Sequence, residues 1–269
     1  MPLTSLGIAS DVMVLGADST LEVHPDRFIL RSPQEPDYWF GNMVILRDDV
    51  IDPDAQIAQF KADFPKATHV TISWDIVGMA SDTRVDVYVA QGFKVDRADV
   101  LTLDRELVRT ETPKDISIRP LETDLDWAKA TELQAITGVA EGNHADEYLP
   151  FIKTRMQTCR RLTQEGRGVW FGAFDGDRLA GDLGIYADPR TARFQAVETR
   201  ERDRRRGICA ALVTAGVEWA KARHPMTCPI IIATKNGDAG RVYRRCGFEM
   251  KEQLLAVYRG PKDAETALG

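Results

Sequence analysis

Three consecutive arginines followed by a glycine are the residues of this chain whose types and spacing best suit a chemical role. Arg204, Arg205, Arg206 and Gly207 link an apolar-rich segment at 192–199 to the amphipathic segment that follows. The first pattern predicts a strand and the second a helix. A helix start offers unpaired backbone N–H groups and the positive end of the helix dipole, and guanidinium groups bind phosphate through paired hydrogen bonds. The stretch therefore predicts an anion site, for which a pyrophosphate is the best-suited ligand.

The spacing of these residues is similar to a known family signature. Arg204-x-x-Gly207-x-Cys209, placed directly after a predicted strand, resembles the Gln/Arg-x-x-Gly-x-Gly/Ala signature of the GNAT acyltransferase superfamily. Cys209 departs from this pattern, since Gly or Ala is usual there, but a Cys side chain is small enough for the loop to form. The resemblance implies acetyl-CoA as the acyl-donor cosubstrate, with its pyrophosphate and 3′-phosphate held by the loop residues Arg204, Arg205, Arg206, Gly207, Ile208 and Cys209.

A second segment carries the same resemblance. Asn236-x-x-Ala239-x-x-x-Tyr243-x-x-x-Gly247-Phe248 resembles the GNAT segment that follows the fifth strand, where the Asn holds the pantetheine arm and the Tyr protonates the departing thiolate. An amide can donate and accept hydrogen bonds, and a phenol with a pKa near 10 keeps its proton at neutral pH. The resemblance implies Asn236, Ala239 and Tyr243 as cofactor-binding residues and Tyr243 as the catalytic acid. The alternative is that Tyr243 is a packed helix residue with its hydroxyl at the surface.

The end of the predicted strand at 192–199 is where the acyl group is expected. The resemblance places Val197 and Thr199 there, with backbone groups that would bind the cofactor and stabilise charge on the acyl carbonyl. Glu198 is the nearest carboxylate for a general base. Strict strand alternation puts Glu198 on the same side as Phe194, and a β-bulge would reverse this. A paired or solvated Glu198 is the alternative, and His144, in a polar loop, is a second candidate for the base.

The elements that position these residues follow from the hydrophobic pattern. In the second half we expect helices that start near 124 and 208 and others at 147–165 and 239–246. The strands of this half are expected at 116–120, 169–174, 179–186, 192–199, 229–234 and 253–258, the last of which closes its sheet. In the first half we expect helices at 5–16, 53–64 and 82–91, and strands at 28–30, 38–46, 69–74 and 94–103. The fold class is α/β, with mixed, mostly antiparallel twisted sheets flanked by helices.

The two halves share a motif. Tyr-x-x-x-Gly-Phe occurs at Tyr88 and again at Tyr243, each time between predicted strands, which favours a duplication. We therefore expect two tandem GNAT-like domains, a degenerate one without a cofactor loop at 1–104 and an acyltransferase domain at 115–260. A polar linker is expected at 105–114 and a C-terminal tail at 261–269. The alternative for the first half is a lid or an unrelated α/β appendage.

Composition limits the classes of function. The chain has 269 residues, a formal net charge of -6 and a pI near 5.4, which argue against a general nucleic-acid binder. No apolar run reaches the roughly 20 residues that span a bilayer, and no secretory signal pattern is visible. The four cysteines, Cys159, Cys209, Cys228 and Cys246, lack metal-ligand spacing. We expect a cytoplasmic protein with reduced thiols and without a metal, nucleic-acid or membrane partner.

The resemblance as a whole implies an acyl-CoA-dependent N-acyltransferase. An amine, either a small molecule or a peptide, would attack acetyl-CoA directly, with Tyr243 as the acid and Glu198 as the candidate base. We expect one cofactor per chain and acceptor selection within 136–168, and a homodimer is compatible with the sequence. The alternative class is a non-catalytic coenzyme A-binding sensor or interaction protein.

Overall fold

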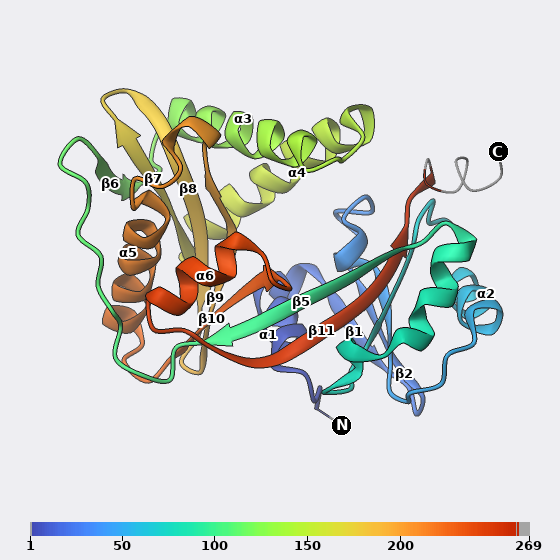
Figure 1. Cartoon of the computed structure of the whole chain (residues 1–269). Helices are drawn as coiled ribbons and strands as arrows, with labels where there is room; N and C mark the ends of the chain where they lie inside the picture. The colour runs from blue at the N-terminus through green and yellow to red at the C-terminus, as the bar shows by residue number, and fades with distance from the viewer. Residues whose placement is uncertain (1, 262, 264–269) are drawn as a thin grey trace. The chain divides into compact units, whose positions relative to one another are not determined.

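The computed structural model describes residues 2–261 and 263, which form two compact units (Figure 1). The first unit contains the described parts of 1–100, 232–237 and 250–269, and the second contains 101–231 and 238–249. Both units are therefore discontinuous in the sequence, unlike the linear halves expected from the residue pattern. Most of the predicted tail at 261–269 lies outside the described residues.

The first unit begins with α1 (Leu6–Leu15) and is built on a mixed sheet. Its strand order is β1-β2-β3-β4-β11-β5, and β3 and β4 run parallel while β1, β2 and β3 pair antiparallel. The unit also contains α2 (Pro53–Asp63), between the parallel strands, and the 3₁₀ segment η4 (Thr83–Gln91). The strands are β1 (Thr20–Val23), β2 (Arg27–Arg31), β3 (Met43–Leu46), β4 (Val70–Trp74), β5 (Lys94–Thr102) and β11 (Glu249–Arg259).

The last strand of the chain belongs to the sheet of the first unit. Residues 256–259 of β11 pair antiparallel with residues 70–73 of β4, and Leu255 and Val257 are buried in the same core as Ile72 and Trp74. The expectation that 253–258 closes the sheet of the second half is therefore wrong. The segment QLLAVY has the apolar content of a strand, but a strand pattern does not specify its pairing partner.

The second unit contains a sheet of order β10-β9-β8-β7-β6. β6 to β9 pair antiparallel, and β10 runs parallel to β9. A tight hairpin at Asp175-Gly176-Asp177 joins β7 to β8, with Gly176 at a φ of 57°. The strands are β6 (Ser117–Pro120), β7 (Gly168–Asp175), β8 (Arg178–Ala187), β9 (Thr191–Thr199) and β10 (Cys228–Thr234).

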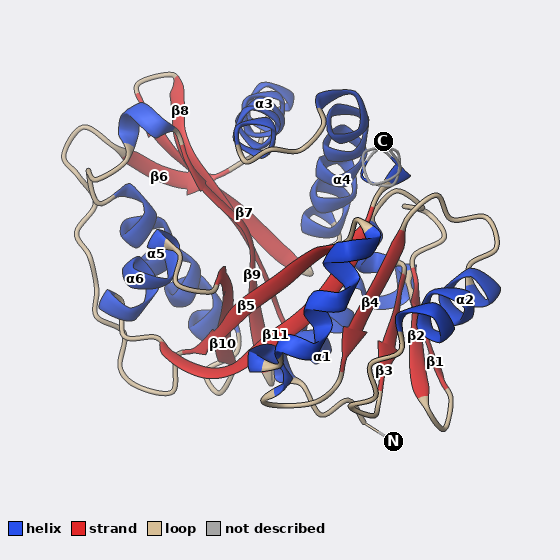
Figure 2. Ribbon diagram, turned by 45° about the vertical axis from the view of Figure 1, so that its right-hand side comes forward, coloured by secondary structure: helices blue, strands red, loops and turns tan. Residues whose placement is uncertain are grey.

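Helices cover both faces of the second sheet (Figure 2). α3 (Asp124–Ala140) and α4 (Ala145–Gln164) pack on one face, and α5 (Ile208–Arg223) packs on the other, near α6 (Asp238–Arg245). Phe194 and Leu183 point toward Gly216 of α5, whereas Asp182 points toward Gln134 of α3. These contacts show which side chains of β8 and β9 face each helix layer.

The polar segment at 105–114 has no regular secondary structure but is held to the second unit. The backbone N–H of Val108 donates to the carbonyl of Cys246 at 3.0 Å, and the N–H of Thr110 donates to Oγ1 of Thr214 on α5 at 3.2 Å. Its polar composition reflects an exposed path along this unit. Within the described residues, none of the helices combines the length and the apolar character that crossing a bilayer requires.

Candidate active site

A β-bulge in β9 determines on which face of the sheet the side chain of Glu198, the candidate base, lies. Gln195 pairs with Gly184 and Glu198 pairs with Asp182, so two residues of β9 lie opposite one residue of β8. Ala196, inside the bulge, has a φ of 45°. The extra residue reverses the alternation that follows it, so Glu198 faces α3 while Phe194 faces α5. The placement of Glu198 on the side of Phe194, which strict alternation predicts, is therefore wrong.

A set of buried hydrogen bonds stabilises this bulge. The side-chain amide of Gln134 donates to Oδ1 of Asp182 at 2.7 Å and to the carbonyl oxygen of Ala196 at 3.0 Å. Nε1 of Trp170 donates to Oδ2 of Asp182 at 3.3 Å. Asp182 is fully buried, and this burial raises its pKa well above the usual carboxyl range. Gln134 and Asp182 were missed from the sequence, where the signal was a polar residue in an otherwise apolar pattern.

Glu198 is a half-buried carboxylate with the ionisation properties of a base at neutral pH. Burial, and to a smaller extent the nearby charge of Glu141, raise its pKa from 4.5 to about 7. The charge of Arg204 and a hydrogen bond with the Thr137 side chain act in the opposite direction. A carboxylate that titrates near neutrality can accept a proton and release it again, which is what general base catalysis requires.

The end of β9 offers free backbone and an unpaired hydroxyl. β9 pairs with β10 only from Thr191 to Arg193, and the strand continues to Thr199 beside β8. Val197 and Thr199 lie in this last part. Oγ1 of Thr199 is buried without a hydrogen-bond partner in the described part of the chain. A buried hydroxyl without a partner is costly, so this position fits a ligand that bonds to it.

The start of α5 is open to an anion. Gly207 is the N-cap residue with a φ of 84°, and no side chain caps the helix. The first turn contains no acidic residue, and no heavy atom lies within 4 Å of the position that a Cβ of Gly207 would occupy. Arg204 and Arg205 are exposed beside this opening. The N–H groups of Ile208 and Cys209 belong to the first helical turn, whose donors the helix itself leaves unpaired. These features fit a phosphate group.

Arg206 differs from the two preceding arginines. Its guanidinium pairs with Asp203 and Asp115 and lies 3.6 Å from Asp175. Asp203 is buried and also pairs with Arg178. Because carboxylates already surround it, the Arg206 side chain holds the loop in its conformation.

Tyr243 lies on α6 and is buried, with 3% of its surface exposed. Burial raises its pKa well above 10, and the nearby Cys209 and Glu198 raise it further, while Arg193 lowers it. The hydroxyl has no hydrogen-bond partner among the described residues. The structure therefore brings together a protonated phenol from α6, the start of α5 at Cys209 and the carboxylate of Glu198.

Comparison with known families agrees with this architecture. Residues 125–248 match the family model of the acetyltransferase (GNAT) family. The chain contains a GNAT acetyltransferase domain. This GNAT domain runs from the first turn of α3 to Phe248, so it includes the bulge, the arginine loop and Tyr243. The resemblance inferred from the sequence is confirmed. No curated protein matches the sequence.

Solved structures with the same fold include proteins with GNAT names. A GCN5-related N-acetyltransferase from Kribbella flavida has a TM-score of 0.63 and 16% identity, and 96% of each chain is covered. A tandem GNAT protein from the clavulanic acid biosynthesis pathway has a TM-score of 0.56 and 14% identity, with 97% of this chain and 90% of that chain covered. A functionally unknown conserved protein from Staphylococcus epidermidis has a TM-score of 0.70 and 13% identity over 93% and 97% of the two chains. The expected fold class, α/β with tandem GNAT-like folds, is confirmed.

The remaining predicted residues are less closely tied to the GNAT site. Asn236 has a φ of 63° in the turn before α6 and belongs to the first unit, and Ala239 lies in the first turn of α6. Their contact with a cofactor stays a prediction. His144 is the exposed N-cap residue of α4 and is not among the groups that affect the pKa of Glu198. Burial raises the pKa of the Cys209 thiol to about 12, so this thiol is neutral.

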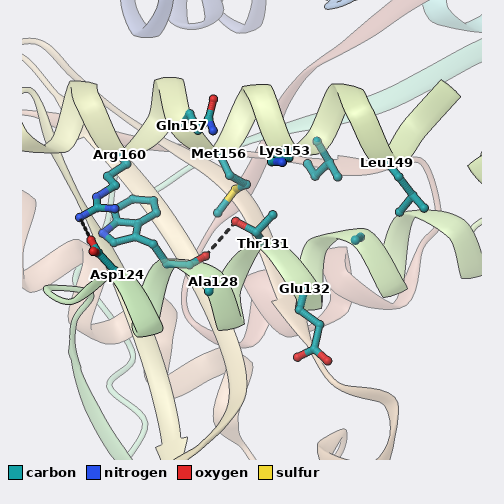
Figure 3. A pocket seen from close by; sticks show the side chains of 12 residues that line it. Asp124, Ala128, Thr131, Glu132, Leu149, Lys153, Met156, Gln157 and Arg160 are labelled. Carbon is teal, nitrogen blue, oxygen red and sulfur yellow. Dashed lines mark hydrogen bonds and ion pairs between the residues drawn. The ribbon is translucent and has the colours of Figure 1, made fainter. Parts of the chain in front are cut away.

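A cavity of about 460 Å³ in the GNAT domain lies apart from these groups (Figure 3). It opens between α3 and α4, where Arg160 pairs with Asp124 and Oγ1 of Thr131 donates to the carbonyl of Trp127 at 2.8 Å. Neither Glu198 nor the arginine loop lines it. Its lining residues are Asp124, Trp127, Ala128, Thr131, Glu132, Ala135, Leu149, Ile152, Lys153, Met156, Gln157 and Arg160.

Proposed function

We propose that the GNAT domain is an acyl-CoA-dependent N-acetyltransferase that moves an acetyl group from acetyl-CoA to an amine. The observation that carries the proposal is the bulge in β9. It turns the half-buried carboxylate of Glu198, with a pKa near 7, toward α3. The charge of this carboxylate also acts on the buried, protonated Tyr243 and on Cys209 at the uncapped start of α5. A base, an acid and an anion site are the three groups that direct acyl transfer from a thioester to an amine requires.

Acetyl-CoA would lie along the end of β9 and the start of α5. Its pyrophosphate would accept hydrogen bonds from the backbone of Gly207, Ile208 and Cys209, with Arg204 and Arg205 adding positive charge. Arg206, whose guanidinium is paired with carboxylates, would keep the loop in shape. Backbone groups at Val197 and the hydroxyl of Thr199 would bind the pantetheine and acyl part, and Asn236 and Ala239 would contact the pantetheine arm.

The chemistry follows from the two titratable side chains. Glu198 accepts a proton from the ammonium group of the acceptor, and the neutral nitrogen attacks the thioester carbonyl carbon. The C–N bond forms, the C–S bond breaks, and the sulfur takes the proton of Tyr243. Over the reaction the acceptor nitrogen loses two protons. One ends on the coenzyme A thiol through Tyr243, and the other leaves to solvent through Glu198.

Calorimetry with acetyl-CoA tests the proposal. The wild type should bind one equivalent per chain, and Gly207→Glu should abolish binding, because the added carboxylate enters the phosphate site. Gly78→Glu is the matched control, since Gly78 also has a positive φ, 91°, with no atom within 4 Å of its Cβ position, and lies in the first unit. It should bind normally. A wild type that binds no acyl-CoA would refute the proposal.

The sensor alternative predicts a different outcome. A coenzyme A-binding sensor would bind the cofactor but acetylate no amine in a broad panel. Tyr243→Phe would then change neither the cofactor affinity nor the absent acetylation. The proposed enzyme should release free coenzyme A thiol in the presence of an amine.

A further inference from the structure

A polar stripe on α3 points to the kind of amine that the site accepts. The buried face of α3 begins with apolar side chains such as Ala130 and Leu133. It then becomes polar at Gln134 and Thr137, and the exposed C-cap residue Glu141 follows. The spacing i, i+3 and i+7 places the three residues on the same side of the helix.

The contacts of this stripe are consecutive along the end of β9. Gln134 bonds to the bulge carbonyl of Ala196, and Thr137, one turn later, bonds to Glu198. Glu141, one further turn along, lies where the helix ends and is exposed. The negative charge of Glu141 raises the pKa of Glu198, which indicates that the two carboxylates lie near each other. A second carboxylate is thus placed one helical turn beyond the residue that contacts the proposed base.

Tyr148 of α4 forms another wall of the same region. Its ring lies directly on Gly138, where an added Cβ would come within 2.1 Å of the ring carbons. Glycine is unfavourable inside a helix, so the close ring contact explains its presence there. The Tyr148 hydroxyl interacts with the charges of both Glu198 and Glu141. The ring therefore lies near both carboxylates and limits the space around them.

The charge around the base is unbalanced. The titratable groups whose charges act on or respond to Glu198 are Glu141, Tyr148, Asp182, Arg204, Cys209 and Tyr243. Arg204 is the single cation in this set, and the proposed function directs its charge to a phosphate. Glu141 has no ion-pair partner in the part of the chain that the structure describes. Glu141 and Glu198 repel each other when both are ionised, and a ligand with two positive charges would offset this repulsion.

We propose that the acceptor is a dicationic amine, with the reacting amine at Glu198 and a second cationic group held by Glu141. The chemical class is a linear diamine or an amine with a guanidinium group. This inference rests on the proposed function and makes Glu141 a specificity residue rather than a catalytic one.

Steady-state kinetics with two acceptors tests the inference. The acceptors are 1,4-diaminobutane and butylamine, which share a chain length and differ in the second charge. The wild type should have a lower KM for the diamine. At pH 8 to 9, where Glu198 is ionised with or without the charge of Glu141, Glu141→Gln should raise the diamine KM about fivefold, the upper range for one exposed ion pair. It should leave kcat and the butylamine KM unchanged. Higher salt should weaken the preference in the wild type but not in the variant.

Glu122→Gln is the matched control, because it removes the same charge from an exposed position at the other end of α3. It should leave both KM values unchanged. Equal KM values for the two amines, or a diamine KM that Glu141→Gln does not alter, would overturn the inference and leave the acetyltransferase proposal intact. Absence of acetyl-CoA binding in calorimetry would instead refute the proposed function itself.

Discussion

The two units each contain a strand, a helix and a parallel strand, and only the second has an open helix start. In the first unit β3 and β4 pair from Val44–Ile72 to Leu46–Trp74, and α2 connects them. In the second unit β9 and β10 are connected by α5, but β9 contains a β-bulge and pairs with β10 only from Thr191 to Arg193. The parallel strands and the connecting helix are shared, so this topology alone does not create a site.

The starts of the two helices differ in charge and in capping. Asp52 caps α2 by accepting a hydrogen bond from the N–H of Ala55, Pro53 opens the helix, and Asp54 adds a negative charge. α5 begins at Gly207 without a side-chain cap and without an acid in its first turn. A helix start that bonds its own carboxylate repels phosphate, whereas an open start can bind it. This difference supports the prediction that the first GNAT-like region lacks a cofactor loop.

The repeated Tyr-x-x-x-Gly-Phe motif is explained by helix termination. In both copies the Phe N–H donates to the Tyr carbonyl at 3.1 Å, and the Gly has a positive φ, 77° at Gly92 and 99° at Gly247. The hydroxyls differ, because that of Tyr88 donates to Gln56 whereas that of Tyr243 has no partner among the described residues. The motif therefore ends a helical segment in both units, and the surroundings of the hydroxyl decide whether it is available for chemistry.

The largest expected effect concerns Glu198, which has no counterpart in the regular strand β3. Glu198→Gln should lower kcat about a hundredfold, the usual contribution of a general base, without changing acetyl-CoA affinity. In the wild type, kcat/KM should fall about tenfold per pH unit below pH 7, because the protonated carboxyl cannot accept a proton. The variant should lose this acidic limb. Rates measured from pH 5 to 9 check both points.

Glu201→Gln provides the control, since Glu201 is an exposed carboxylate three residues away. It should behave as wild type, and an unchanged kcat in Glu198→Gln would exclude Glu198 as the base. Stability gives an independent readout. The pKa of Glu198 rises from 4.5 to about 7 on folding, so the wild type loses stability as the pH rises through this window. Glu198→Gln should therefore raise Tm at pH 8 but not at pH 4.

The two tyrosines give a matched pair of substitutions. Tyr243→Phe should lower kcat about tenfold or more while cofactor binding and stability stay near wild type, because the lost hydroxyl has no protein partner. Tyr88→Phe should leave kcat unchanged and lower the free energy of unfolding by about 1 kcal/mol, because it removes a hydrogen bond inside the first unit. Urea denaturation and initial rates measure both. The reverse pattern would contradict the assignment of chemistry to the second copy.

The smallest effect concerns the cap of α2. Asp52→Ala should lower the free energy of unfolding by about 1 kcal/mol, and Asp52→Gly by only a few tenths, as for other helix caps. Neither substitution should change the acetyl-CoA dissociation constant or its stoichiometry. A variant that binds a second equivalent would show that the capping carboxylate is all that closes the first helix start. Denaturation curves and calorimetry give the two measurements.

Local patterns in the sequence specified most of the elements. The helices at 53–64 and 147–165, and the apolar strand at 229–234, were predicted to within a few residues. Apolar spacing, caps and Gly or Pro breaks act between near neighbours, so they can be recognised without a partner. Two predictions were less accurate, since β1 at Thr20–Val23 was missed and residues 39–41 form a 3₁₀ turn instead of the start of a strand. The glycine loop before α5 and the Tyr243 motif also follow from local spacing.

The tertiary structure decided how these parts combine. The sequence could state that a bulge would turn Glu198, but the bulge depends on the register with β8 and on the bond from Gln134 to Ala196. The pairing of Arg206 with Asp115 depends on a residue 91 positions away, and β11 pairs with β4 across an even longer separation. Such contacts are set by strand register and by burial in a shared core. Local residue patterns do not specify such contacts. The sequence alone therefore predicts an anion loop and Tyr243 as a site residue, whereas the direction of the Glu198 side chain follows only from the fold.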